Sequence, residues 1–267
     1  MRIATWNIKS LNTRRDELLR WLRENQPDIM GLQETKTDDA EFVERYQPEF
    51  RNEGYLSACC GEKGRNGVAI LSRRPLEVTQ RGLPGQEDLG ARLLTALTPA
   101  VSFTTVYVPS ASRKDSAAEA DATQRKLGWI DALLRYIGTS PDGVVPSIVC
   151  GDFNIAPEPI DDWMHWHDRK RGKREPGFSD DERSRIRSLE KAGWVDLVRH
   201  PNPKEKLFSW WSRPNLYLQN KGLRLDLVFG NQAAVERLRS AQIIHTPYEE
   251  RGRAGEVDHA PVIVNLA

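Results

Sequence analysis

The sequence has no apolar run near the roughly 18 consecutive residues of a membrane-spanning helix, and its amino terminus lacks the long apolar segment of a secretory signal. We therefore expect a cytoplasmic protein without membrane contact. Only three cysteines occur in 267 residues, so they cannot all pair with one another. Cys59 and Cys60 are adjacent, which is not the spacing of a metal knuckle, and we expect reduced, structural thiols.

The chain also lacks a strong charge of either sign. Its formal net charge is +1, so overall charge does not indicate a polyanionic partner. One segment differs, because residues 168–175 (DRKRGKRE) place five basic residues in a short polar stretch. Two interpretations stay open for it. It is either a solvated loop or, if a phosphate-cleaving site lies nearby, a contact surface for a nucleic-acid backbone.

Short apolar, β-branched segments alternate with longer segments of helical periodicity. Strands are expected at residues 2–8, 28–34, 55–60, 66–73, 92–98, 101–108, 147–154, 207–212, 223–229, 241–246 and 260–266. Helices are expected at 13–25, with Thr13 as its cap, around 38–46, at 117–137 and near 181–192. No linker or repeat divides the chain. These patterns predict a single α/β domain, residues 1–267, with helices on the outer faces of its sheets.

Polar residues recur where these apolar strands end: Asn7, Glu34, Asp152, Asn154, Asp226, Asp258 and His259. Any one of them alone is explained as a turn or cap residue. Together they form a set of hard oxygen donors with one imidazole, since a carboxylate at a buried strand end must be paired, hydrated or metal-bound. Such a set suits Mg²⁺ and phosphate ester chemistry better than zinc, which prefers cysteine and histidine.

Eight ordered motifs carry a more specific resemblance: TWNIKSLN, LQETK, GRNGVAILS, YVPSAS, GDFNIAPEPID, FSWW, GLRLDL and VDHAP. In order and spacing they resemble the exonuclease III family of AP endonucleases, over residues 5 to 261. The resemblance implies a four-layer α/β sandwich, in which two mixed β-sheets pack face to face with helices outside. It also implies a site at one edge of the sheets.

The resemblance assigns roles to individual residues. Glu34 matches the principal metal ligand, and the wider metal set would be Asn7, Glu34, Asp152, Asn154, Asp258 and His259. The catalytic set would be Tyr107, Asp152, Asn154, Asp226 and His259. Asp152 would either activate the attacking water or protonate the leaving oxygen, and both roles stay open. Asp226 would orient His259, whose other nitrogen would face the scissile phosphate.

Substrate recognition is assigned to residues outside this cluster. Trp210 and Trp211 with Leu223 match the apolar pocket for a base-free sugar, and Asn220 precedes that pocket. One of the two tryptophans is expected to be buried. Contacts to duplex DNA are expected from Arg113, Lys170 and Arg171, with solvated side chains as the alternative.

The implied function is a Mg²⁺-dependent DNA repair nuclease, with Mn²⁺ also accepted. It would act as a monomer on duplex DNA, cutting 5′ to abasic sites and trimming or cleaning 3′ ends as an exonuclease and 3′-phosphatase. Two alternatives remain: another phosphoesterase of the same fold, such as a non-specific DNase or an inositol-phosphate phosphatase, and a DNA-binding relative with weakened catalytic activity.

Two features depart from the family pattern. Lys9 stands where the family commonly has Asn or Asp. His165 and His167 lie in a segment that does not align with the family motifs, and they are either solvated or a pair of metal ligands.

Overall fold

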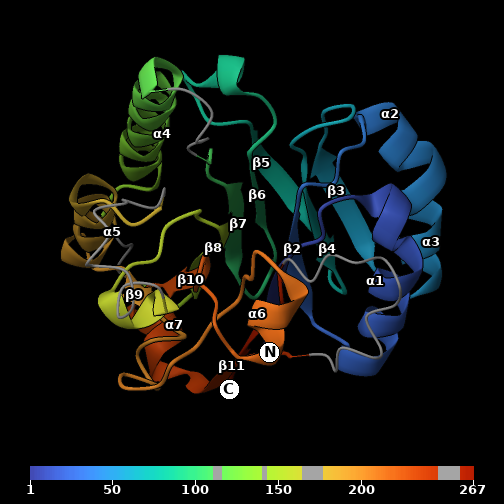
Figure 1. Cartoon of the computed structure of the whole chain (residues 1–267). Helices are drawn as coiled ribbons and strands as arrows, with labels where there is room; N and C mark the ends of the chain where they lie inside the picture. Colours follow the sequence, from blue (N-terminus) through green and yellow to red (C-terminus); the bar gives the residue numbers. More distant parts are fainter. Residues whose placement is uncertain (111–115, 140–142, 164–176, 246–258) are drawn as a thin grey trace.

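The computed structural model describes residues 1–110, 116–139, 143–163, 177–245 and 259–267. In it two six-stranded sheets lie between two sets of helices (Figure 1). The helices α4 (Ser116–Ile137) and α5 (Asp180–Lys191) lie on one outer side, and α1 (Leu11–Asn25) lies on the other. The predicted four-layer α/β sandwich is therefore confirmed.

The first sheet has the strand order β11-β12-β1-β2-β4-β3. Its strands are β1 (Arg2–Asn7), β2 (Ile29–Gln33), β3 (Leu56–Cys60), β4 (Val68–Ser72), β11 (Leu238–Ile243) and β12 (Val262–Leu266). Strands β1 and β2 are parallel, while their outer neighbours β12 and β4 pair with them in antiparallel fashion. The sheet is therefore mixed, as expected.

The second sheet has the order β5-β6-β7-β8-β10-β9. Its strands are β5 (Glu77–Arg81), β6 (Leu93–Leu97), β7 (Ser102–Tyr107), β8 (Ser147–Asp152), β9 (Val195–Asp196) and β10 (Asp226–Gly230). Here β7 and β8 form the parallel pair, and β6 and β10 flank them in antiparallel fashion. Each sheet thus has a central parallel pair whose carboxyl ends lie at one edge.

The remaining helices are short. α2 (Asp39–Glu41), a π-helical turn (Phe42–Tyr46) and α3 (Gln47–Asn52) follow one another on the side of α1, while α6 (Pro214–Leu218) and α7 (Gln232–Glu236) follow α5 in the chain. Among the helices in the described ranges, none combines the length and apolar character that a membrane span requires.

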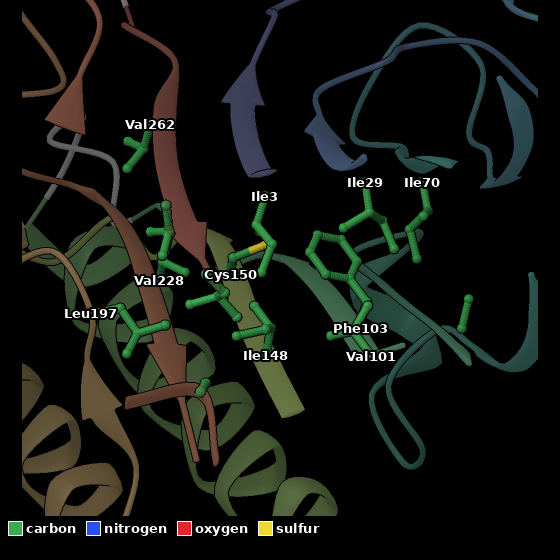
Figure 2. Packing of buried hydrophobic residues seen from close by; sticks show 14 of the residues in the cluster. Ile3, Ile29, Ile70, Val101, Phe103, Ile148, Cys150, Leu197, Val228 and Val262 are labelled. Carbon is green, nitrogen blue, oxygen red and sulfur yellow. The ribbon is translucent and has the colours of Figure 1, made fainter. Parts of the chain in front are cut away.

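The core follows the alternation of side chains along each strand. On β1, Ile3 packs between the two sheets, while Ala4 faces the helical layer with Leu18 of α1. Figure 2 shows the inter-sheet layer, in which Ile3, Ile29 and Ile70 of the first sheet lie opposite side chains of the second. On its outer face the second sheet packs against Trp129 and Ile130 of α4. Both sheets are therefore buried on two faces.

Two local predictions are wrong, and several short elements were missed. Helix α1 begins at Leu11 and not at residue 13, and its N-cap position is Ser10 rather than Thr13. Residues 207–212 form isolated bridges at Trp210 and no regular strand, because this segment crosses between β10 and the chain before β12. Strand β5 was not predicted, since its side chains alternate between half-buried and exposed at the sheet edge, which weakens the apolar pattern.

Candidate active site

Polar side chains from both sheets meet at the edge where the parallel strands end. Asn7 closes β1, Glu34 follows β2, and Asp152 closes β8. The Asn7 side-chain amide donates through Nδ2 to Glu34 Oε1 at 3.0 Å and to Asp152 Oδ2 at 2.9 Å. Asn7 thus joins a carboxylate of the first sheet to a carboxylate of the second.

Glu34 lies among donors and a cation. Tyr107, the last residue of β7, donates its hydroxyl to Glu34 Oε1 at 3.0 Å, and Lys36 Nζ lies 2.9 Å from Glu34 Oε2. Burial opposes ionisation of Glu34, but the hydrogen bonds from Lys36 and Asn7 and the charge of Lys36 outweigh it, so the pKa of Glu34 is lowered. The carboxylate is therefore charged at neutral pH. Burial and the charge of Glu34 raise the pKa of Tyr107, which stays a proton donor.

Asp152 is almost fully buried and held at both oxygens. Its Oδ1 accepts from the Asn154 backbone N–H at 2.8 Å, and its Oδ2 accepts from Asn7. Asn154 itself has a positive φ of 51°, a backbone conformation that costs free energy and is found most often at functional sites. Burial is the largest cause that raises the pKa of Asp152, and the charge of Asp226 raises it further. His259 lowers the pKa, but the net result is a pKa of about 7. This carboxyl can therefore exchange a proton near neutral pH.

His259 and Asp226 form a buried pair beside Asp152. Asp226 Oδ2 lies 2.8 Å from His259 Nδ1, and His259 Nε2 lies 3.6 Å from Asp152 Oδ2. In the register of the second sheet, Asp226 of β10 lies directly opposite Asp152 of β8. The bond to Asp226 fixes the ring so that Nε2 is directed toward Asp152.

A short crossing segment holds this pair in place. Ser209 Oγ accepts from the backbone N–H groups of Leu225 and Asp226, both at 3.0 Å, and the Ala260 N–H donates to the Ser209 carbonyl at 2.7 Å. Trp210 forms bridges to Leu223 on one side and to His259 on the other. The segment therefore aligns the start of β10 with the residues before β12.

The residues present fit a divalent cation. Asp152, Asp226 and His259 offer ligand atoms that all lie within 4.8 Å of one another. However, Asp226 and His259 already use Oδ2 and Nδ1 in their mutual hydrogen bond. Glu34 offers an ionised carboxylate, the kind of hard oxygen ligand that divalent cations prefer, and Lys36 forms an ion pair with one of its two oxygens. Asn7 turns its nitrogen toward the two carboxylates and accepts from the Lys9 N–H with its oxygen.

The structure brings together the five predicted catalytic residues, Tyr107, Asp152, Asn154, Asp226 and His259, and the predicted metal ligands Asn7 and Glu34. Of the predicted substrate residues, Trp210 and Leu223 are half-buried and adjacent, and Asn220 is exposed in the turn after α6. Trp211 is buried, which confirms that one tryptophan of the pair belongs to the core. Arg113, Asp258, Lys170, Arg171, His165 and His167 lie outside the described residues.

Lys36 and Ser209 are site residues that were not predicted from the sequence. Lys36 stands in the LQETK motif two residues after Glu34, so its spacing was available as an indication. Ser209 gave no such indication, because a serine between two aromatic residues reads as part of a strand. Ser209 acts as an acceptor for the N–H groups of Leu225 and Asp226 only because residues 207–212 do not form the predicted strand but pass beside the start of β10.

The raised pKa of Asp152 predicts that the stability difference between the wild-type protein and Asp152→Asn depends on pH. Between about pH 4 and 7 the unfolded chain loses this proton while the native site keeps it, so the carboxyl destabilises the metal-free fold as pH rises. Asp152→Asn does not titrate. We expect the melting temperature of Asp152→Asn, relative to wild type in EDTA, to increase from pH 5 to pH 8, as measured by calorimetry. A difference that is constant or falls over this range contradicts the assignment.

Paired mixed sheets with buried acids, amides and a carboxylate-bound histidine at one edge define a class of layered α/β hydrolases. The model of the endonuclease/exonuclease/phosphatase family matches residues 4–248, and the chain belongs to this family. The family predicted from the motifs is therefore confirmed.

Similar proteins of known sequence and structure indicate more closely which kind of hydrolase this is. The chain is 32% identical over 248 residues to an exodeoxyribonuclease of Bacillus subtilis, covering 91% of this chain and 93% of that protein. An AP endonuclease from Archaeoglobus fulgidus has a TM-score of 0.87 at 30% identity, covering 100% and 99% of the two chains. The 3′ phosphatase NExo from Neisseria, bound to product DNA hairpin, has a TM-score of 0.83 at 28% identity, covering 100% and 99%. These relatives indicate a hydrolytic nuclease.

Proposed function

We propose that this protein is a metal-dependent DNA repair nuclease that cuts the phosphodiester 5′ to abasic sites, leaving a 3′-hydroxyl, and also trims and cleans 3′ ends. The observation that carries the proposal is the meeting of Glu34, Asp152 and His259 at one edge of the two sheets. The similarity to an exodeoxyribonuclease, an AP endonuclease and a 3′ phosphatase supports this range of substrates.

The metal proposed for the site is Mg²⁺, with Mn²⁺ as a substitute. Glu34 would be its principal ligand, with Asn7, Asp152, Asn154, Asp258 and His259 as the residues from which further ligands come. An ionised carboxylate among amide and acid oxygens is the donor set that hard divalent cations prefer. When bound, the ion would supply positive charge beside the phosphate oxygens.

The other catalytic roles would belong to side chains of the site. Asp152 would take the proton from the attacking water, and Asn154 and Asn7 would hold its carboxylate in place. His259, oriented by Asp226, and the Tyr107 hydroxyl would stabilise negative charge that develops on the phosphate.

Substrate selection would depend on the segment beside His259. Trp210 forms backbone bridges to both Leu223 and His259, and the half-buried side chains of Trp210 and Leu223 would form the wall of a slot for a flipped, base-free sugar, with Asn220 at its rim. Arg113, Lys170 and Arg171 would contact the duplex backbone without reading sequence. We propose that the chain acts as one domain and as a monomer.

Incubation with an abasic duplex and, separately, with an inositol polyphosphate tests this proposal. We expect Mg²⁺-stimulated incision of the duplex, with a 3′-hydroxyl product, and no phosphate release from the inositol compound. The opposite preference would indicate another phosphoesterase of this fold. Duplex binding without any turnover would indicate a DNA-binding relative that has lost its activity.

Glu34→Ala tests the metal assignment. Removal of the carboxylate is expected to raise the Mg²⁺ concentration for half-maximal activity by about tenfold or more, because a charged ligand is lost. Mn²⁺ binding, followed by electron paramagnetic resonance, should weaken in parallel. Glu49→Ala, on the distant helix α3, is the matched control. An unchanged metal titration would exclude Glu34 as a ligand.

A further inference from the structure

Buried polar side chains lie between the two sheets just below the candidate active site. Thr5, Gln33 and Thr105 are all completely buried, although the inter-sheet layer is otherwise apolar, as Figure 2 shows for its labelled residues. A buried amide is unfavourable unless it is hydrogen-bonded. These side chains therefore need one another, and their arrangement is specific.

Gln33 connects the sheets directly. Its Nε2 donates to Thr5 Oγ1 of its own sheet at 2.9 Å and to Thr105 Oγ1 of the opposite sheet at 2.8 Å. The side chains of Thr5, Gln33 and Thr105 thus form a chain of hydrogen bonds that crosses from one sheet to the other at the Gln33–Thr105 bond.

Each member of this chain lies next to a site residue in sequence. Gln33 directly precedes Glu34, and Thr5 stands two residues before Asn7 on β1. Thr105 stands two residues before Tyr107 on β7. Residues two apart on a strand point to the same face, so these hydrogen bonds lie one layer below the site.

Close packing fixes the spacing at this point. A Cβ atom at Gly31 would lie 2.5 Å from Thr105 Oγ1, so the backbone of β2 approaches the threonine closely. The Gln33 Oε1 atom is buried and has no hydrogen-bond partner among the described residues. An apolar side chain at position 33 would avoid the free-energy cost of burying this unpaired oxygen. A hydrogen-bonded polar network, in contrast, specifies one geometry.

We propose that Gln33 is a positioning residue of the nuclease reaction: its bond to Thr105 sets the separation between the carboxylate of Glu34 on one sheet and that of Asp152 on the other. The proposal rests on the proposed function. Catalysis and metal binding both need groups of the two sheets at a fixed separation, and a small displacement of such groups has a large effect on rate.

Gln33→Met and Thr105→Val remove the cross-sheet bond with little change in volume. We expect each to lower kcat on abasic duplex about tenfold or more while KM stays unchanged, and to weaken Mn²⁺ binding to the DNA-free protein by a similar factor. Because both changes remove the same bond, their effects in the double variant should not add. Thr105→Ser keeps the hydroxyl and should restore nearly wild-type values.

Thr104→Val is the matched control. Thr104 is also a buried threonine of β7, but its hydroxyl bonds Thr95 within the same sheet, at 2.9 Å. We expect Thr104→Val to lower the melting temperature without a change in kcat or Mn²⁺ affinity. If Gln33→Met and Thr105→Val behave like Thr104→Val, Gln33 is structural only and the proposal is overturned. Should Gln33→Met fail to fold, Thr105→Val decides alone. A wild-type protein without nuclease activity refutes the proposed function instead, while Mn²⁺ titration still tests Gln33.

Discussion

Asp152→Asn is expected to lower turnover on abasic duplex DNA by about 10³-fold, within the range that general acid and base groups contribute. The Asp152 carboxylate lies between Asn7 Nδ2, the Asn154 N–H and His259 Nε2, and burial raises its pKa to about 7. An asparagine has the same shape but cannot accept a proton from water at neutral pH. The loss should therefore fall on kcat, measured in single-turnover experiments.

The same variant should keep its fold and its affinity for DNA. The side-chain oxygen of an asparagine can still accept the Asn154 N–H, and the neutral amide removes a carboxyl whose ionisation burial disfavours. Circular dichroism and duplex binding provide the controls. Near wild-type turnover would reject Asp152 as the base, whatever the binding result.

His259→Asn is expected to lower turnover by about 10²-fold or more, the loss that follows removal of one donor to a developing oxyanion. Asp226→Asn should act in the same direction, because it breaks the hydrogen bond to Nδ1 that fixes the ring. Since Asp226 acts through His259, the double variant should be little worse than His259→Asn alone.

His200→Asn is the matched control for this prediction. His200 is an exposed histidine in the turn after β9, away from the start of β12. Its substitution should leave turnover unchanged. Equal losses in His200→Asn and His259→Asn would indicate a general effect on folding, and additive losses in the Asp226 and His259 pair would contradict their coupling.

The sequence was sufficient to predict those site residues that stand at the ends of buried strands. Asn7, Glu34 and Asp152 could be found because a polar group at the end of an apolar strand needs an explanation, and parallel strands bring such groups to one edge. The motifs then predicted the sandwich, and the two mixed sheets confirm it.

What could not be predicted depends on contacts between distant segments. Residues 207–212 have the composition of a strand, yet their hydrogen bonds go to Leu223 and to the chain around His259, which no local pattern specifies. Gln33 reads as an ordinary member of a buried strand. Its importance appears only when β7 of the other sheet lies opposite it, with Thr105 in hydrogen-bonding distance.

The central claim is that groups of the two sheets hold one divalent cation beside the scissile phosphate. The most direct test is a crystal structure of the protein with Mn²⁺ and incised abasic DNA, with the cation located by anomalous scattering. We expect a cation bound to the Glu34 carboxylate, with the terminal phosphate between the cation and His259. A cation bound only by Asp226 and His259, or a phosphate far from Asp152, would contradict this claim.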